Sequence, residues 1–126
     1  MSIDVLTEIY VDSTGYGHFW PHNASVYATL FAAATKAIKA ELNDDAVLFA
    51  GPNVIPTNSA NKEFFTSFIE ACYKLGYDEC PLDLATLHYF STDATRPGVF
   101  GAWIHSQLTS VFDQSASFPT PRMAIT

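Results

Sequence analysis

The sequence predicts an α/β domain in which strands and helices alternate along the chain. Short apolar runs recur at intervals of about forty residues, and the segments between them carry apolar residues three and four positions apart. This alternation is typical of parallel strands joined by helical crossovers. With 126 residues, the chain is long enough for one domain with one core. We therefore expect residues 1–126 to form a single unit.

Four apolar runs are interpreted as strands. The second is apolar at every position, which is typical of a strand covered on both faces of a parallel sheet. The third has few polar interruptions. The predicted strands cover residues 3–11, 46–50, 82–90 and 122–126.

Three segments between these runs have helical periodicity. Asn23 is placed to cap the first helix, and Asn61 is the predicted N-cap of the second, which Gly76 should end. The predicted apolar stripes cover residues 26–42, 64–75 and 100–112. The expected order is therefore β-α-β-α-β-α-β, with about four parallel strands and three helices.

The links that follow strands are longer than the links that follow helices. Residues 12–22, 51–60 and 91–98 connect a strand to the next helix, whereas 43–45 suffice between a helix and a strand. In α/β folds, the loops after the carboxyl ends of strands build the functional site. We expect the site of this chain in those loops.

Composition excludes several classes of protein. Six Lys and Arg against thirteen Asp and Glu give a net charge of −7, which argues against binding to nucleic acid or to an anionic membrane surface. A hydrophobic content of 48% is too high for a disordered chain. No apolar run is long enough to span a bilayer, and the first residues do not resemble a signal peptide. Cys72 and Cys80 are expected to stay as thiols.

Three blocks in a fixed order carry a family resemblance. The first consists of residues 7–12, Phe19-Trp20 and the predicted helix that leads into 47–52; the others are 82–90 and 121–126. Together they resemble the middle of the catalytic barrel of glycoside hydrolase family 39, the β-xylosidase and α-L-iduronidase family. The resemblance covers nearly the whole chain and implies a partial (β/α)8 TIM barrel, strands four to seven.

The resemblance also implies site residues. The fourth strand of the family ends in Trp-Asn-Glu-Pro, whose Glu is the general acid/base, and here Asp12 stands at that position. His88 and Tyr89 match substrate-side residues of the sixth strand, and Gly51-Pro52 matches the turn after the fifth. Trp20 is a candidate for stacking on a sugar ring. No metal ligand set and no cofactor are expected.

A retaining glycosidase needs two carboxyl groups about 5 to 5.5 Å apart. Asp12 is one methylene shorter than Glu, and a misplacement near 1 Å costs about a hundredfold in rate. The nucleophile of the family follows a Thr at the end of the seventh strand, which corresponds here to Thr126, and in a longer gene a Glu is expected one or two positions later. The isolated chain is therefore expected to have no turnover.

Three interpretations remain open at this stage. The chain is a fragment or degenerate half of a retaining glycoside hydrolase, completed by further strands. Alternatively, it is a non-catalytic carbohydrate-binding half-barrel, whose two copies pair edge to edge as a homodimer. The third is a small doubly wound domain with helices on both faces of an open sheet. The expected partner is a carbohydrate, with no nucleic acid and no membrane.

Overall fold

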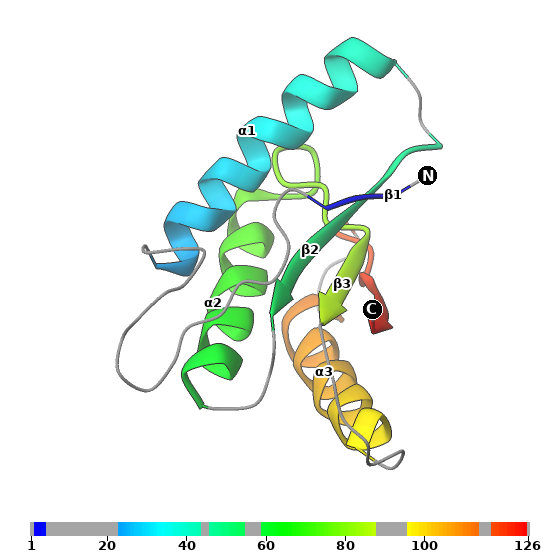
Figure 1. Cartoon of the computed structure of the whole chain (residues 1–126). Helices are drawn as coiled ribbons and strands as arrows, with labels where there is room; N and C mark the ends of the chain where they lie inside the picture. Colours follow the sequence, from blue (N-terminus) through cyan, green and yellow to red (C-terminus); the bar gives the residue numbers. More distant parts are fainter. Residues whose placement is uncertain are drawn as a thin grey trace.

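The computed structural model describes residues 2–4, 23–43, 46–54, 59–87, 96–113 and 117–125. Strands and helices alternate through these ranges (Figure 1), which confirms the α/β prediction. The elements are β1 (Ser2–Asp4), α1 (Ala24–Leu42), β2 (Leu48–Val54), α2 (Ser59–Leu75), β3 (Leu84–Leu87), α3 (Arg96–Phe112) and β4 (Arg122–Ile125). None of the helices in the described ranges is long and apolar enough to cross a bilayer.

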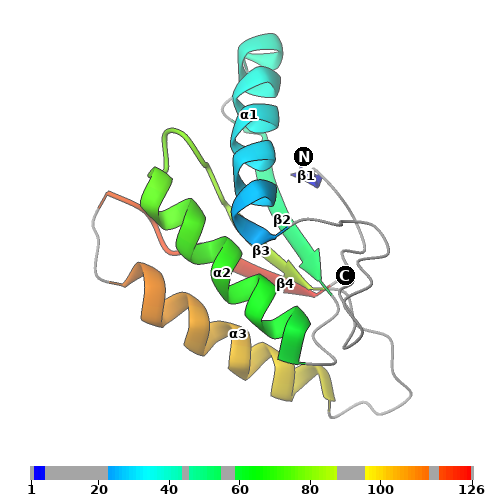
Figure 2. The same ribbon diagram turned by 90° about the vertical axis from the view of Figure 1, so that its left-hand side faces the viewer.

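The strands lie in the order β1-β2-β3-β4, and every neighbouring pair is parallel. Their carboxyl ends therefore meet at one edge of the sheet. The three helices cover a single face (Figure 2). A doubly wound domain needs helices on both faces, so that interpretation is wrong for the described part of the chain.

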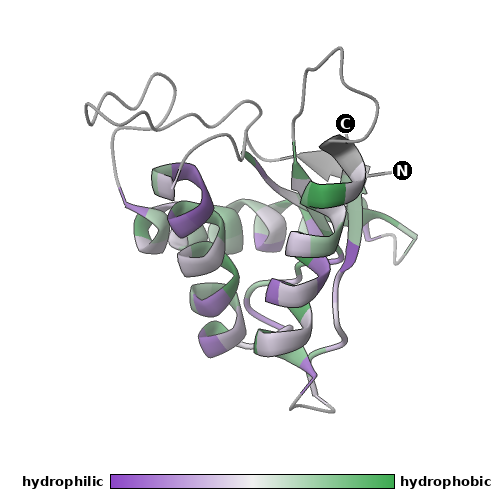
Figure 3. Ribbon diagram, turned by 90° about the horizontal axis from the view of Figure 1, so that it is seen from below, coloured by the Kyte–Doolittle hydropathy of each residue, from purple (hydrophilic) through white to green (hydrophobic). Residues whose placement is uncertain are grey.

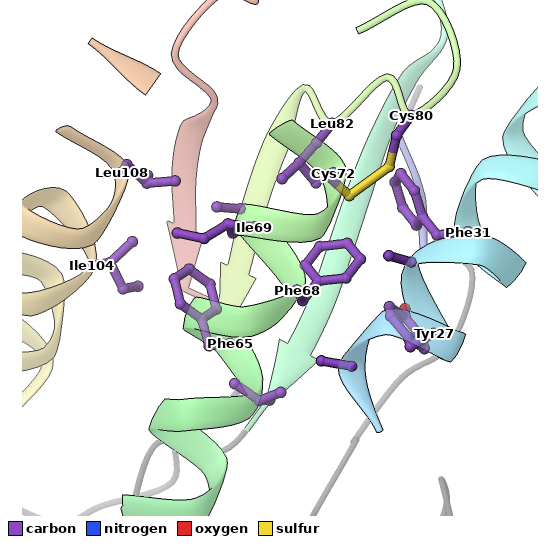
Figure 4. Packing of buried hydrophobic residues seen from close by; sticks show 14 of the residues in the cluster. Tyr27, Phe31, Phe65, Phe68, Ile69, Cys72, Cys80, Leu82, Ile104 and Leu108 are labelled. Carbon is purple, nitrogen blue, oxygen red and sulfur yellow. A yellow bond between two sulfur atoms is a disulfide. The ribbon is translucent and has the colours of Figure 1, made fainter. Parts of the chain in front are cut away.

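Helix α2 lies at the centre of the helical layer. Figure 4 shows its residues Phe65, Phe68 and Ile69 between side chains of α1 on one side and side chains of α3 on the other. Phe68 packs edge-on against the rings of Tyr27 and Phe31 at centroid distances of 5.1 and 5.5 Å. On the other flank, the rings of Phe65 and Trp103 have centroids 5.4 Å apart.

The helices are amphipathic, as their periodicity predicts. Figure 3 shows hydrophilic and hydrophobic residues on each helix that it draws. Asn23 caps α1 as predicted, because its Oδ1 accepts a hydrogen bond of 3.0 Å from the N–H of Val26. At the other end, Asn43 adopts the left-handed conformation and its N–H donates to the Lys39 carbonyl.

The predicted start of α2 is wrong, whereas its end is confirmed. The helix begins at Ser59, so Asn61 lies inside its first turn rather than at the N-cap, and it is 1% exposed. Asn favours caps in sequence statistics, whereas here the side chain at position 61 is buried. Gly76 ends the helix with φ at +89°, and its N–H donates to the Cys72 carbonyl.

Strand β2 differs most from the prediction. The sequence predicts a strand that ends at residue 50, and the family resemblance implies a turn at Gly51-Pro52. Instead, β2 continues to Val54 and contains both residues. A Cβ at position 51 would lie 3.3 Å from the Phe31 ring, so glycine fits the close packing of α1 on the strand. The register shifts between Pro52 and Val54, which is where a strand tolerates a residue without an N–H.

The remaining strand and helix bounds are partly as predicted. Strand β4 matches its expected range within the described residues. Strand β3 begins two residues later than expected, at Leu84, and α3 begins at Arg96, inside the link predicted for 91–98. Of the strand predicted for residues 3–11, residues 5–11 lie outside the described ranges, and β1 covers its start. Residues 88–90, the end of the strand predicted for 82–90, also lie outside them.

The expectation of free thiols is wrong. Cys72 of α2 and Cys80 form a disulfide, with Cα atoms 5.3 Å apart (Figure 4). The chain turns back directly after Gly76, and the Cys80 N–H donates to the Gly76 carbonyl at 2.9 Å. The turn therefore returns Cys80 to the last turn of the helix. Both cysteines are fully buried in the core cluster.

Candidate functional site

The two faces of the sheet carry different side chains. Phe49 and Ala85 belong to the core beneath the helices, and Gly51 lies against Phe31 of α1. Since successive strand residues point to opposite faces, the residues alternating with these lie on the other face, here called the helix-free face because none of the described helices covers it. On β2, β3 and β4 it consists of Leu48, Ala50, Pro52, Leu84, Thr86, Arg122 and Ala124.

Two buried polar side chains lie near the carboxyl ends of β2 and β3. Asn53 is 2% exposed and has a left-handed φ of 56°, directly after the cis Gly51-Pro52 peptide. Thr86 is also 2% exposed and is in register with Pro52. Its Oγ1 is buried and has no hydrogen-bond partner in the structure as described.

A buried hydroxyl without a partner costs roughly 1 to 3 kcal/mol. Most buried polar groups in folded proteins are satisfied by protein or water, so such a group identifies a position where a ligand or water could add a hydrogen bond. Thr86 lies two residues before His88, one of the residues selected from the sequence. This end of β3 is therefore the described position nearest in the chain to the predicted site.

The site residues predicted from the sequence lie outside the described ranges. Asp12 and Trp20 fall in the chain between β1 and α1, and His88 and Tyr89 directly follow the last residue of β3. The roles assigned to these four residues remain predictions. The structure describes β1 and β3, the strands that precede these two segments in the chain.

A surface hollow of about 380 Å³ lies between the first turns of α1 and α2. Ser25, Glu63 and Phe64 are among the residues that line it. Both helices begin after the carboxyl ends of strands, so the hollow lies on the same side of the fold as the predicted site. Its walls are in the helical layer, however, and none of the residues of the helix-free face contributes to it.

At the amino edge of the sheet, hydrogen bonds of one residue, Asp83, connect the strands. The Asp83 carboxylate accepts a hydrogen bond of 2.8 Å from the N–H of Phe49 and another of 2.6 Å from the hydroxyl of Tyr77. The backbone of Asp83 also bonds to Phe49 and to Arg122, at 2.9 and 3.0 Å. One residue thus joins β2, β3 and β4 at their starts.

Burial and the contact with Asp83 change the pKa of the Tyr77 hydroxyl. Burial, followed by the hydrogen bond and negative charge of Asp83, raises the pKa of Tyr77 from 10.0 to about 12. Lys39 of α1 lies over the Tyr77 ring, 5.6 Å from its centroid, and at 5.7 Å from that of Phe49. These contacts attach α1 to the amino edge, where α/β folds concentrate stability rather than function.

No group of three or more His, Cys, Asp and Glu side chains is arranged to hold a metal ion among the residues that the structure describes. On β2 and β3, the polar side chains near the carboxyl edge are a carboxamide and a hydroxyl. A carboxamide and a hydroxyl are each able to donate and accept hydrogen bonds, as recognition of a neutral ligand requires, and neither group titrates as an acid or base.

Sequence reasoning missed both Asn53 and Thr86. A signal for Asn53 existed, because Asn tolerates the left-handed conformation and follows Gly-Pro here. Thr86 carries no such signal, since a threonine within an apolar strand is common. Only the strand register identifies it as a buried hydroxyl on the helix-free face.

Comparisons with known proteins identify no relative of this chain. A scan against models of protein families, a search of curated proteins and a search of solved structures each found no match for this chain.

Proposed function

We propose that this chain is a portion of a (β/α)8 glycoside hydrolase barrel that resembles family 39 and binds carbohydrate at the carboxyl edge of its sheet. The observation that carries the proposal is the topology: parallel strands in sequence order with the helices on one face. This is the arrangement of consecutive β-α units in a barrel wall, whose helix-free face is the inner one. Further strands would complete the barrel.

In this proposal Asp12 acts as general acid/base, and Trp20, His88 and Tyr89 contact the sugar. The neutral polar groups of Asn53 and Thr86 extend the same edge with hydrogen-bonding capacity for hydroxyl groups. Of the two carboxylates that a retaining mechanism needs, the sequence supplies only Asp12 at a matching position. The isolated chain therefore binds without turning over.

The first test is hydrolysis of aryl β-xylosides and related aryl glycosides by the purified chain. No release of the phenol above the rate without protein is expected. Hydrolysis that an Asp12→Ala substitution abolishes would show that the isolated chain is active and would refute this part of the proposal.

A second test separates a degenerate catalytic site from a site that only binds. Added azide can replace a missing carboxylate nucleophile: it attacks the anomeric carbon, the bond to the aryl oxygen breaks, and Asp12 donates a proton to the leaving group. Glycosyl azide should then form slowly with an activated aryl glycoside, and Asp12→Asn should suppress it for less activated leaving groups. Sugar binding without any azide-dependent product would favour the non-catalytic half-barrel.

Binding itself can be followed through tryptophan fluorescence, because the chain has only two tryptophans, Trp20 and Trp103. Trp103 packs between α2 and α3 against Phe65. A fluorescence change on adding xylo-oligosaccharides should therefore persist in Trp103→Phe and disappear in Trp20→Phe. No change across a panel of glycans would count against carbohydrate binding of either kind.

The non-catalytic alternative is favoured by one feature of the described edge. Near the ends of β2 and β3, the buried polar side chains are Asn53 and Thr86, and neither is ionisable. Stacking and hydrogen bonding to a sugar need no carboxylate pair. The azide experiment decides between the two functions.

A further inference from the structure

The sequence contains one Asn-X-Ser/Thr motif, Asn23-Ala24-Ser25. Each of the other four asparagines is followed two positions later by a residue other than Ser or Thr. This motif is the acceptor pattern for N-linked glycans, which occupy the surface of exported proteins. Because so short a pattern also arises by chance, the assignment of a glycan requires structural observations that are independent of the motif.

Asn23 lies on the surface, at the start of α1. Both Asn23 and Ser25 are exposed, whereas Asn53 and Asn61 are 2% and 1% exposed. A glycan is bulky and hydrophilic, so its attachment site must face solvent in the folded chain. The motif therefore falls on an asparagine that meets this condition.

The capping contact orients the Asn23 carboxamide. Its Oδ1 accepts a hydrogen bond of 3.0 Å from the N–H of Val26, so the oxygen is directed at the first turn of the helix. Nδ2, the atom to which an N-linked glycan is attached, diverges from this oxygen on the planar carboxamide. An N-glycosylated carboxamide keeps its oxygen as an acceptor and one N–H as a donor. Glycosylation therefore leaves the cap of α1 intact.

Space for the first sugar lies beside Asn23. The hollow of about 380 Å³ between α1 and α2 is lined by Asn23 itself and by Glu63, Phe64 and Ser67 of α2. The carboxylate accepts hydrogen bonds, and the serine hydroxyl both donates and accepts them. This wall suits the hydroxyl and acetamido groups of a sugar attached to Nδ2. The hollow belongs to the helical layer, apart from the helix-free face.

The disulfide indicates the compartment in which the chain folds. Cys72 and Cys80 are the only cysteines of the sequence, and the bond between them is fully buried in the core cluster. Structural disulfides form and persist in oxidising compartments such as the secretory pathway, and they are rare in the cytosol. N-linked glycans are added in the same pathway. Two independent features, the disulfide and the motif, thus indicate the same compartment.

We propose that Asn23 is the acceptor of an N-linked glycan, added while the chain passes through an oxidising secretory compartment. The donor is an oligosaccharide on a polyisoprenyl diphosphate, and a transferase of that compartment catalyses the step. Nδ2 of Asn23 forms a bond to the anomeric carbon, the bond from this carbon to the diphosphate oxygen breaks, and the lipid diphosphate leaves. One proton of Nδ2 is released, and nothing is oxidised or reduced. The proposal does not depend on carbohydrate binding at the carboxyl edge.

The experiment is expression of the full chain behind a cleavable secretion signal in cultured animal cells, with the chain recovered from both the cells and the medium. Mass spectrometry should show one added oligosaccharide per chain. An amidase specific for N-glycosylated asparagine should remove it and leave an aspartate at position 23. Alkylation of the same material should modify neither Cys72 nor Cys80, because both sulfurs are held in the disulfide.

Substitutions within the motif test the site. Asn23→Asp should abolish the mass shift while an oxygen remains to cap α1, and Ser25→Ala should abolish it while Asn23 stays in place. Ser25→Thr keeps the motif and should retain the glycan. Asn43→Gln is the matched control, since it replaces the asparagine at the other end of α1 and outside the motif; this variant should be glycosylated like the wild type.

A wild-type chain without a glycan in both cells and medium overturns the proposal, and so does a glycan that persists in Ser25→Ala. Reactive thiols at Cys72 and Cys80 in the glycosylated chain would contradict the compartment assigned from the disulfide. Far-UV circular dichroism should show the same helix content in the glycosylated chain and in Ser25→Ala. A lower helix content in the glycosylated chain would show that the glycan disrupts the cap of α1, against the geometry of Asn23.

Discussion

The two edges of the sheet differ in the hydrogen bonding of their buried polar groups. At the amino edge, Asp83 bonds to the backbone of β2 and to the hydroxyl of Tyr77, and its backbone reaches β4. Near the carboxyl edge, the hydroxyl of Thr86 is buried on β3 without a hydrogen-bond partner in the described structure. One edge connects the strands, and the other retains an unsatisfied group.

From this difference we propose that the amino edge serves stability and that the carboxyl edge serves binding. Unsatisfied buried groups cost folding free energy, and a functional role is one reason why natural proteins retain them. In α/β folds the carboxyl ends of the strands carry the site. Substitutions at the amino edge should therefore lower stability, whereas substitutions at the carboxyl edge should affect binding with little loss of stability.

The largest effect is expected for Asp83→Ala. It removes the acceptor for the Phe49 N–H and for the Tyr77 hydroxyl, so the free energy of unfolding should fall by about 3 kcal/mol. Urea denaturation measures this loss. Asp113→Ala is the control, because the bond of Asp113 to Thr120 is exposed; its effect should stay within about 0.5 kcal/mol. Equal effects of the two substitutions would contradict the role given to Asp83.

The disulfide also belongs to the amino edge, because it links the end of α2 to the segment that enters β3. It closes a loop with a sequence separation of 8. Replacing both cysteines by alanine should cost about 2 to 3 kcal/mol through the larger entropy of the unfolded chain. Denaturation of this double variant and of the wild type, with and without a reductant, measures the effect. Reductant should destabilise the wild type alone, and an identical response of both proteins would argue against the bond.

Tyr77→Phe should have a smaller effect, about 1 kcal/mol at neutral pH. The folded-state pKa of Tyr77, about 12, lies above its ordinary 10.0. Its contribution to stability is thus fully present below pH 10 and is lost as pH rises through 12. The stability difference between wild type and Tyr77→Phe, measured from pH 8 to 12, should shrink over that interval. A difference that stays constant would show that the hydroxyl does not titrate in this environment.

Thr86→Val should have the smallest effect on stability and the opposite sign. The substitution removes a hydroxyl without a partner and keeps the branched shape, so stability should stay equal or rise by up to about 1 kcal/mol. If the edge binds sugar, the same variant should bind xylo-oligosaccharides more weakly in a fluorescence titration. A clear loss of stability would mean that the hydroxyl has a structural partner, and the contrast between the edges would fail.

The alternation of strands and helices could be predicted from the sequence because each element shows itself in the spacing of apolar residues within a short segment. The apolar stripe of α1 and the cap at Asn23 depend on neighbours within a few residues. Gly51 could not be assigned in the same way, since its place inside β2 reflects the approach of Phe31 from another element. The same applies to Cys72 and Cys80, which the turn after Gly76 brings together.

The residues of the carboxyl edge were harder to predict than the fold. Asp12, Trp20, His88 and Tyr89 were selected from a family resemblance and from their positions after strands. Asn53 and Thr86 emerge only when the strands are aligned, because burial on one face of a sheet depends on register. The Asp83 network was equally hidden, since its side chain reaches a residue 34 positions away.

The position of β2 and β3 inside the sheet has a consequence for hydrogen–deuterium exchange. Each of these strands is paired on both sides, whereas β1 and β4 are each paired on one side among the described strands. Opening an inner strand requires a neighbour to separate first, so its amides exchange through rarer fluctuations. Deuterium should therefore enter β1 and β4 early and reach the amides of Ala50 and Ala85 last.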